Sequence, residues 1–281
     1  MAVKIVTDTL SDITGDLAVE LGVTVVPLYV RFGETMYRDR VEITTDEFYR
    51  RLINEGAFPS TTQPTPNDFL EVYKNLSKET DEILVITVSS KLSGTYQSAT
   101  QAKALLKSEC RIEIIDSLSV AMGEGLIVID AAGAVKAGAK LAEVAEVARK
   151  AVPRSHLIAY FDTLKYLARG GRIGKAQGLL GSMLSVKPML TIKDGEMAPL
   201  TRVRSFTAAL DYIHGALSAF PNVKLLAVEH STSLANADKL VEKISPLYPK
   251  EKIYRAVISP VIGTYAGPDA MALSFIEGDK K

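Results

Sequence analysis

The chain has 281 residues, 47% of them hydrophobic, which is enough to bury a large core and exceeds the usual size of a single domain. Lys and Arg together number 33, as do Asp and Glu, so no net charge draws the protein to nucleic acid or to an anionic membrane surface. The only cysteine, Cys110, excludes an internal disulfide and any site built from several cysteines.

The sequence also lacks the marks of membrane insertion, secretion and common cofactors. No run of 18 apolar residues occurs, and the start "MAVKIVTDTL" has no apolar signal core, so we expect a cytoplasmic protein without stable membrane insertion. Metal-binding spacings such as HExxH are absent, and "MGEGLIV" lacks the third glycine of a dinucleotide fingerprint. We therefore predict neither a metal nor a cofactor, and we expect a monomer.

Short β-branched runs alternate with helical segments in the first half of the chain. After a strand at 3–8, a helix capped by Ser11 or Asp12 and ended by Gly22 is predicted. The elements that follow are a strand at 23–33, helices at 44–56 and from Asn67, a strand at 81–90, a helix at 93–106, a strand at 111–117 and a long helical region at 123–152. This alternation predicts an N-terminal α/β, Rossmann-like domain over residues 1–152, with a parallel sheet between helices.

After Pro153 the predicted strands follow one another more closely. They lie at 156–162, 187–203, 223–231, 252–259 and 272–278, with helices at 205–220 and 234–247. The pair Asp194-Gly195 is typical of a tight hairpin, so at least one antiparallel pairing is expected here. Residues 153–281 are therefore predicted to form an α+β two-layer domain, which makes the whole chain a two-domain α/β protein.

Polar residues follow the predicted strands of the first half, at the edge where α/β sheets bind their ligands. Caps and turns prefer the same residue types, so a structural role is favoured for any single cluster taken alone. The candidates at these strand ends are Asp8, Ser89, Ser90, Ser93, Gly94, Thr95, Asp116, Ser117 and Ser119.

Seven motifs, in order and over essentially the whole chain, resemble the DegV family of bacterial fatty-acid-binding proteins. They are "TDTLSDI", "PSTTQPTP", "SSKLSGTYQSA", "DSLSVAMGEG", "LKYLARGGRI", "VKPML" and "IGTYAGP". The resemblance implies a carrier, not an enzyme, that holds a long-chain fatty acid in an apolar tunnel. It further implies that the carrier presents this ligand to a separate fatty acid kinase, which makes acyl-phosphate for phospholipid synthesis.

The resemblance also implies which residues hold the fatty-acid carboxylate. Thr61 and Ser93 match the head-group hydroxyls of the family, and Thr62 is a neighbouring candidate. The family usually has a histidine where Tyr265 stands, so we expect Tyr265 to donate one hydrogen bond without becoming cationic. The alternatives are that Tyr265 packs as tunnel wall or that this member prefers a different ligand. The remaining cleft candidates near it are Gly263 and Thr264.

Three further expectations leave alternatives open. Arg169, Arg172 and Arg202 are interpreted either as a basic lip that docks the kinase or as a solvated loop. Apolar side chains at 178–190 fit a tunnel wall and ordinary core packing equally well. The competing functions are an enzyme on an acyl or phosphorylated substrate, with Ser93 as nucleophile or Asp8 and Asp116 as acid-base groups, and a regulator that responds to lipid.

Overall fold

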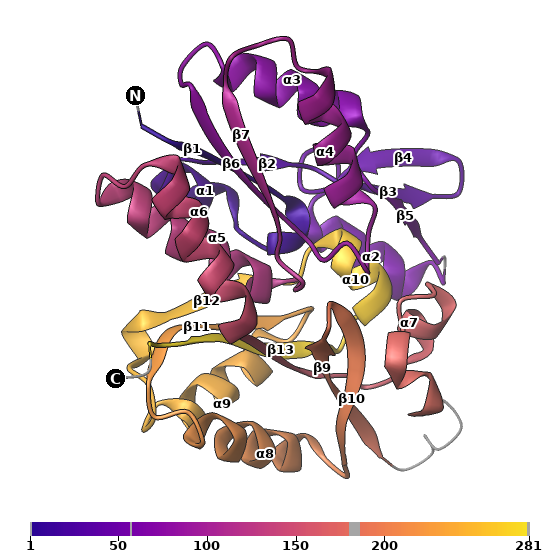
Figure 1. Cartoon of the computed structure of the whole chain (residues 1–281). Coiled ribbons are helices and arrows are strands. Elements are labelled where there is room, and N and C mark those ends of the chain that lie inside the picture. Colours follow the sequence, from indigo (N-terminus) through magenta and orange to yellow (C-terminus); the bar gives the residue numbers. More distant parts are fainter. Residues whose placement is uncertain (1, 57, 180–185, 280–281) are drawn as a thin grey trace.

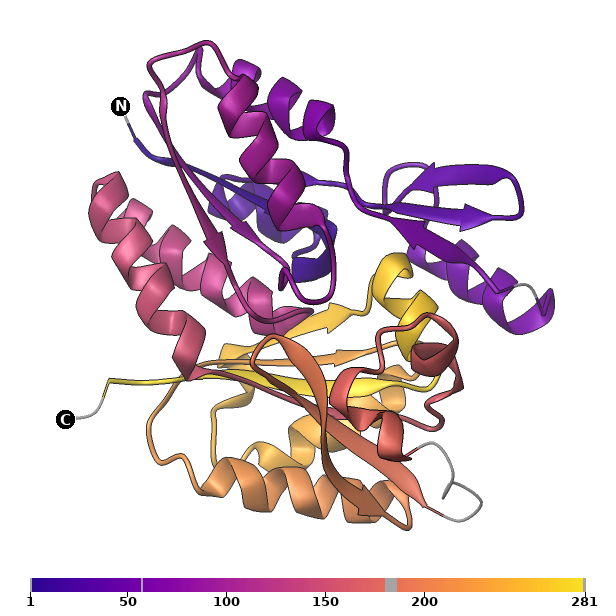
Figure 2. The same ribbon diagram turned by 45° about the vertical axis from the view of Figure 1, so that its right-hand side comes forward.

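The computed structural model describes residues 2–56, 58–179 and 186–279. Within these ranges a parallel sheet and a larger mixed sheet stack with helices on and between them, and a small third sheet projects to one side (Figures 1 and 2). This arrangement confirms the predicted α/β class. The boundary between the two predicted domains, at residues 152 and 153, stays a prediction.

The parallel sheet has four strands in the order β2-β1-β6-β7. Its strands are β1 (Lys4–Asp8), β2 (Val23–Val26), β6 (Glu82–Thr87) and β7 (Arg111–Asp116). Side chains alternate between its two faces. Val6, Ile83 and Val85 pack on one side, in the cluster that includes residues of α3 (Pro66–Leu76) and α4 (Thr95–Leu105).

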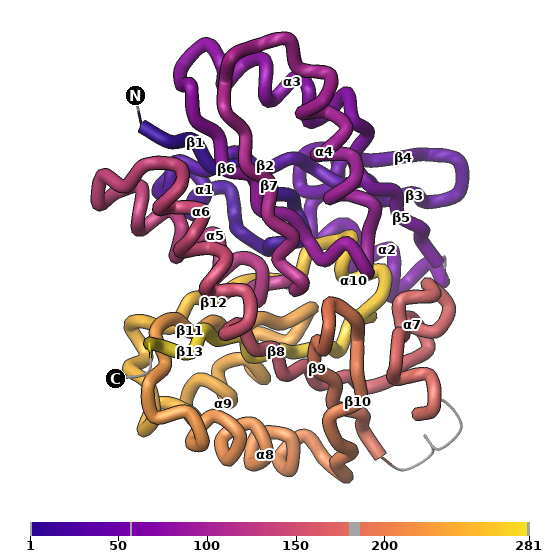
Figure 3. Tube along the Cα trace, in the orientation of Figure 1, coloured from indigo at the N-terminus to yellow at the C-terminus, as the bar shows by residue number. Residues whose placement is uncertain are grey.

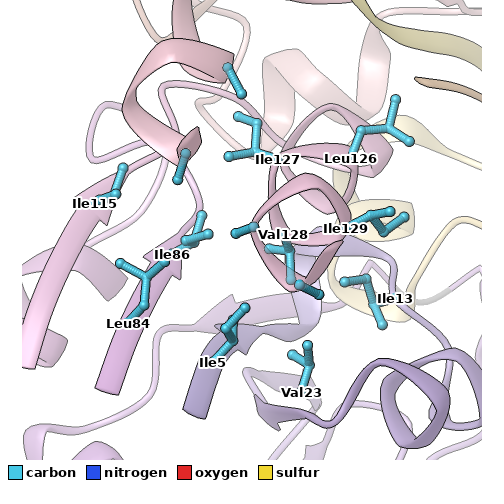
Figure 4. Packing of buried hydrophobic residues seen from close by; sticks show 14 of the residues in the cluster. Ile5, Ile13, Val23, Leu84, Ile86, Ile115, Leu126, Ile127, Val128 and Ile129 are labelled. Carbon is cyan, nitrogen blue, oxygen red and sulfur yellow. The ribbon is translucent and has the colours of Figure 1, made fainter. Parts of the chain in front are cut away.

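The opposite face of the parallel sheet packs on α5 (Met122–Lys136), as Figure 4 shows for Ile5 and Ile86. Most of α5 is buried, because the helix lies between the two large sheets and is apolar on nearly every side. Ala227, Ala256 and Ile276 of the mixed sheet belong to the same core cluster. The two sheets are therefore joined through α5.

The long helical region predicted at 123–152 consists of two helices. Between α5 and α6 (Leu141–Ala151), Gly138 has φ +87°, a backbone conformation that only glycine adopts at little cost and that no helix can contain. The first predicted cap is wrong. Thr14, not Ser11 or Asp12, accepts the capping bond of α1 (Gly15–Leu21), although Gly22 does end that helix.

The mixed sheet has six strands in the order β10-β9-β8-β13-β11-β12, and its outer face is covered by two helices. Only the pair β11–β12 is parallel. The predicted hairpin joins β9 to β10 through Asp194 and Gly195, which both have positive φ. The strands and helices are β8 (Ser155–Tyr160), β9 (Lys187–Lys193), β10 (Glu196–Val203), β11 (Val223–His230), β12 (Ile253–Val257), β13 (Met271–Glu277), α8 (Phe206–Ser218) and α9 (Leu234–Ile244).

The third sheet is antiparallel, in the order β4-β3-β5, and was not predicted. Its strands are β3 (Tyr29–Phe32), β4 (Thr35–Arg38) and β5 (Ser60–Thr62). The single strand predicted at 23–33 is wrong, because Pro27 interrupts the run and has no N–H to donate to a ladder. β2 stays in the parallel sheet, and the Leu28 N–H bonds to Thr9 Oγ1 at 3.1 Å before β3 begins elsewhere.

Two short helices complete the surroundings of the third sheet. The helix α10 (Pro260–Ala266) comes from the end of the chain but lies beside α2 (Thr45–Asn54), as Figure 3 shows. The helix α7 (Lys165–Arg169) packs against α10. Four short 3-10 turns are also described: η1 (Thr9–Ser11), η2 (Val152–Arg154), η3 (Gly174–Leu179) and η4 (Lys250–Lys252).

Candidate functional site

A cavity lies between the parallel sheet and the mixed sheet, and it encloses about 710 Å³ of unfilled space, part of it open to solvent. Among the described residues, its polar lining side chains are Arg172, Glu229 and Tyr265. The apolar lining consists of Leu10, Val88, Leu92, Val120, Ala121, Leu157, Ala159, Phe161, Leu167, Met197, Ile258, Ile262, Ala266, Ala270, Met271 and Ala272.

The two sheets contribute different parts of the cavity wall. Leu10, Val88 and Val120 follow β1, β6 and β7, so the carboxyl edge of the parallel sheet forms one side, as the position of ligands in such sheets predicts. The mixed sheet contributes Ala159 and Ala272, which are direct partners on neighbouring strands. We call the part of the cavity wall that these two small side chains line the trough.

A second depression at the surface shares two residues with the cavity. It is lined by Phe58, Pro59, Ser60, Thr61, Tyr166, Arg169, Gly170, Arg172, Thr264 and Tyr265. Arg172 and Tyr265 line both spaces. We call this depression the mouth, because those two side chains stand between the apolar cavity and the exterior.

At the mouth, the Thr61 and Tyr265 hydroxyls form a hydrogen bond with their oxygens 2.5 Å apart. Thr61 lies on β5 and Tyr265 on α10, so the stretch "PSTTQPTP" and the stretch "IGTYAGP" meet here. Thr62 does not join them, because consecutive side chains of a strand point to opposite faces. Its Oγ1 contacts the sulfur of Met36 at 3.6 Å instead.

Cationic side chains lie over aromatic rings around the mouth. The Arg172 guanidinium carbon lies 5.1 Å from the centre of the Tyr265 ring, and that of Arg169 lies 3.6 Å from the centre of the Phe58 ring. Such contacts hold a cation without neutralising its charge. Arg202 is exposed on β10 and is not among the described residues that line the mouth.

Ser93 is half-buried in the turn before α4, next to Leu92 of the cavity wall. Its hydroxyl bonds to the Thr95 hydroxyl at 2.9 Å. Arg172 connects this turn to the mouth, because its Nε donates to the Leu92 carbonyl at 3.4 Å. The structure therefore brings the Ser93 turn, Thr61 and Tyr265 to one region, with Arg172 between them.

The carboxylates at the strand ends support turns. The two oxygens of Asp8 accept from the Leu10 and Val88 backbone N–H groups, each at 2.9 Å. Burial raises the pKa of Asp8 to about 7, although these two hydrogen bonds oppose the rise. Asp116 Oδ1 accepts from the N–H groups of Ser90 and Leu118, at 3.1 and 3.0 Å.

The other cleft candidates also have structural partners. The Ser117 hydroxyl donates to the Ser119 carbonyl at 3.2 Å, and that of Thr264 to the Pro260 carbonyl at 3.0 Å. A Cβ on Gly94 would lie 2.7 Å from the end of the exposed Gln63 side chain, which can move aside, where that turn meets the end of "PSTTQ". A Cβ on Gly263 would meet the buried Tyr49 and Phe48 side chains, so glycine is required where α10 meets α2. Thr95 is fully buried at the start of α4.

The sequence reasoning missed a group of buried carboxylates that lies behind the cavity. Glu229 lines the cavity but is fully buried, and it accepts from the Met122 N–H at 3.1 Å. Burial raises the pKa of Glu229 well above its usual value, and the nearby Asp12 adds to the rise. Asp39 and Glu124 are also fully buried. The available signal was a glutamate directly after the apolar run of the strand "LLAVEH".

Two features are absent from residues 2–56, 58–179 and 186–279. No group of three or more His, Cys, Asp and Glu side chains there could hold a metal ion. No helix in those ranges combines the length and the apolar character needed to cross a membrane. Of the predicted wall residues at 178–190, those at 180–185 lie outside the described residues, whereas Leu179 and Leu190 belong to the core cluster that surrounds the cavity.

Comparison with known proteins adds a family to this geometry. The family described as "Uncharacterised protein, DegV family" matches residues 2–278. The chain belongs to the DegV family. A DegV domain-containing protein of Caldanaerobacter subterraneus is 39% identical over 281 residues, which cover 98% of this chain and 99% of that protein.

Solved DegV structures have the same fold. A fatty-acid-binding DegV family protein from Thermus thermophilus superposes with a TM-score of 0.91 at 34% identity, covering 99% of this chain and 100% of that one. DegV of Bacillus subtilis, described as a fatty acid binding protein, gives 0.89 at 27% identity with the same coverage. The DegV resemblance and the fold predicted from the sequence are therefore confirmed.

Proposed function

We propose that this chain binds a long-chain fatty acid in the cavity between its two large sheets, with the carboxylate at the mouth. The observation that carries the proposal is the distribution of polarity over the cavity and the adjoining mouth, which share Arg172 and Tyr265. Apart from the buried Glu229, the rest of the described cavity lining is apolar, whereas the mouth contains Thr61. Fatty-acid binding by the Thermus and Bacillus relatives supports the same ligand class.

The apolar walls would supply most of the affinity. Burial of a methylene contributes roughly 0.8 kcal/mol, so about fourteen of them would contribute on the order of 11 kcal/mol before the ordering of the ligand is subtracted. The trough over Ala159 and Ala272 provides contacts along an extended chain. These contacts do not distinguish one end of the ligand from the other.

The polar groups at the mouth would fix the orientation of the ligand. A carboxylate without hydrogen bonds costs several kcal/mol when it leaves water, whereas each hydrogen bond to a charged group returns roughly 1.5–3 kcal/mol. Thr61, Tyr265 and Arg172 offer donors there, and Ser93 lies in the adjoining turn. The methyl end of the ligand carries no polar group, so its burial among the apolar walls has no such desolvation cost.

The enzyme hypothesis receives no support from the same geometry. Ser93 bonds to Thr95, and within the described residues no His, Asp or Glu side chain bonds to its hydroxyl. Asp8 and Asp116 accept backbone N–H groups and do not line the cavity. A nucleophile or acid-base pair requires a different arrangement, in which the base reaches the nucleophile.

Native mass spectrometry of the purified full chain would test the proposal. A retained mass that matches a saturated or monounsaturated fatty acid, removed by delipidation and restored by added palmitate, is the expected result. Absence of palmitate binding after delipidation would contradict the proposal. Turnover of acyl esters by the chain alone would support the enzyme.

Filling the trough provides a matched test of the ligand's location. Ala272→Leu places a larger side chain in the trough and should weaken palmitate binding at least tenfold. Ala104→Leu makes the same change on the exposed side of α4 and should leave binding unchanged. Unchanged binding in Ala272→Leu, with the fold intact by circular dichroism, would place the acyl chain elsewhere.

The second part of the proposal concerns what happens to the bound fatty acid. The bound acid would be presented to a separate fatty acid kinase, by a monomer in the cytoplasm, with the kinase docking on Arg169, Arg172 and Arg202. The carboxylate site opens at the surface beside Arg169, which supports transfer without release of the ligand. Arg169→Glu should impair acyl-phosphate formation by kinase and ATP while palmitate binding persists, and equal loss of both would count against docking.

A further inference from the structure

Three consecutive backbone groups before α10 are each bonded to a side chain from the N-terminal half of the chain. Arg40 donates to the Val257 carbonyl, and the Tyr49 hydroxyl donates to the Ile258 carbonyl at 3.1 Å. The Ser259 N–H donates to Asp12 Oδ1 at 3.0 Å. These side chains come from three separate segments of the sequence, so their convergence on one tripeptide is a property of the fold.

Asp12 and Arg40 also bond to each other, with the Arg40 Nη2 and Asp12 Oδ1 atoms 3.2 Å apart. The Asp12 side chain is fully buried and that of Arg40 is 18% exposed, so solvent screens this ion pair weakly. Both residues have left-handed backbones, at φ +52° and +59°. Non-glycine residues keep such conformations where surrounding contacts hold them, which is consistent with a constrained site.

The tripeptide leads directly into the parts of the molecule that enclose the ligand site. Ser259 caps α10 by accepting from the Ile262 N–H at 3.4 Å. Ile258 and Ile262 line the cavity, and Tyr265, one turn further along α10, meets Thr61 at the mouth. A displacement of residues 257–259 would therefore move the cavity wall and the mouth together.

We propose that Asp12, Arg40 and Tyr49 are positioning residues for ligand binding, although they do not line the cavity or the mouth. We call this group the 257–259 clamp. It fixes α10 against the third sheet, so that Tyr265 stays within reach of Thr61 and the mouth stays narrow around a bound acid. The inference rests on the proposed function, because it concerns how long the chain retains a fatty acid.

The sharpest test removes one hydroxyl. Tyr49→Phe deletes the bond to the Ile258 carbonyl and leaves the ring in place. Stopped-flow displacement of a fluorescent fatty acid should show dissociation roughly 2- to 10-fold faster, the range that one hydrogen bond corresponds to. Tyr73→Phe is the matched control, because its buried hydroxyl donates to the Ala99 carbonyl at 3.3 Å on the other face of the parallel sheet.

The control separates positioning from general stability. If both variants lower the melting temperature similarly but only Tyr49→Phe releases ligand faster, the clamp positions α10. If both variants leave dissociation at the wild-type rate, the inference is overturned, and equal acceleration in both would also overturn it. Failure of the wild type to bind any fatty acid would instead reject the proposed function, so the two failures are distinguishable.

The ion pair gives a second, independent measurement. Arg40→Lys keeps a cation near Asp12, whereas Arg40→Gln leaves a buried carboxylate without one. We expect dissociation to be slowest in the wild type, intermediate in Arg40→Lys and fastest in Arg40→Gln, with chemical shifts of α10 changing in the same order. Equal rates in all three proteins would contradict a role for Arg40.

Discussion

The hydroxyls of Thr61 and Tyr265 bond to each other at the mouth, so each is satisfied before any ligand arrives. A carboxylate between them would accept a hydrogen bond from both, and a charge-assisted bond is stronger than the neutral bond that it replaces. Arg172, over the ring of Tyr265, adds a positive charge at the same place. The pair is therefore suited to exchange its internal bond for a ligand.

Tyr265→Phe tests this exchange at a single atom. Loss of the phenol removes one donor to the carboxylate while the ring still stands beside Arg172, so palmitate affinity should fall by roughly tenfold. Isothermal titration calorimetry with delipidated protein measures the change. Tyr248→Phe, which removes a hydroxyl bonded to the Lys224 carbonyl, serves as the control. Unchanged affinity in Tyr265→Phe would mean that Tyr265 acts only as wall.

The short helix α10 packs closely against α2 at a glycine. A Cβ on Gly263 would lie 2.6 Å from the Tyr49 hydroxyl and 2.7 Å from the Phe48 ring. Both are buried side chains of α2, so neither can move without disturbing the core. Because residue 263 is glycine and has no side chain, α10 can pack directly against α2.

Gly263→Ala should destabilise the protein by about 1–3 kcal/mol, because an added methyl group forces α2 and α10 apart. Urea unfolding followed by circular dichroism measures the change in the free energy of unfolding. Gly215→Ala, in the middle of α8, is the matched control, because nothing lies within 4 Å of its Cβ. Alanine favours a helix over glycine by about 1 kcal/mol, so the control should be stabilised. If the free energy of unfolding changed in the same direction in both variants, the close packing of α10 on α2 at Gly263 would be contradicted.

The sequence predicted most elements but few of their contacts. The alternation of strand and helix segments, the helix caps and the terminal glycines are local signals, so the elements that carry them could be predicted from the sequence. The third sheet was missed because Pro27 divides one apolar run between two sheets, and α10 was missed because seven residues carry little periodicity. Thr61 and Tyr265 are 204 positions apart, so only the family resemblance, not spacing, could pair them.

At the scale of the whole molecule, buried carboxylates predict how stability depends on pH. Burial raises the pKa of Asp39 to about 7, the neighbouring Asp12 adds to the rise, and Arg40 opposes it. The pKa of Asp8 is also raised to about 7 by burial. Both pKa values lie above those of the unfolded chain, so the folded state binds more protons. The stability contributed by these groups is fully present below about pH 4 and is lost as the pH rises through 7.

Asp39→Asn should reduce this dependence, because the amide has no proton to release. Chemical unfolding at pH 5 and pH 8 should show a smaller loss of stability on raising the pH in Asp39→Asn than in the wild type. Asp81→Asn, at an exposed position, should retain the wild-type difference. A pH dependence that Asp39→Asn leaves intact would show that Asp39 does not carry it.

The strand order of the mixed sheet has a consequence for biosynthesis. The strand β13, the last in the described residues, takes a central place between β8 and β11. While the ribosome makes residues 155–270, these two strands have unpaired edges that invite contact with other nascent chains. The sheet closes only when residues 271–277 have left the exit tunnel, so its completion waits for a strand made long after its neighbours. A chain that lacked this strand would have its mixed sheet divided in two.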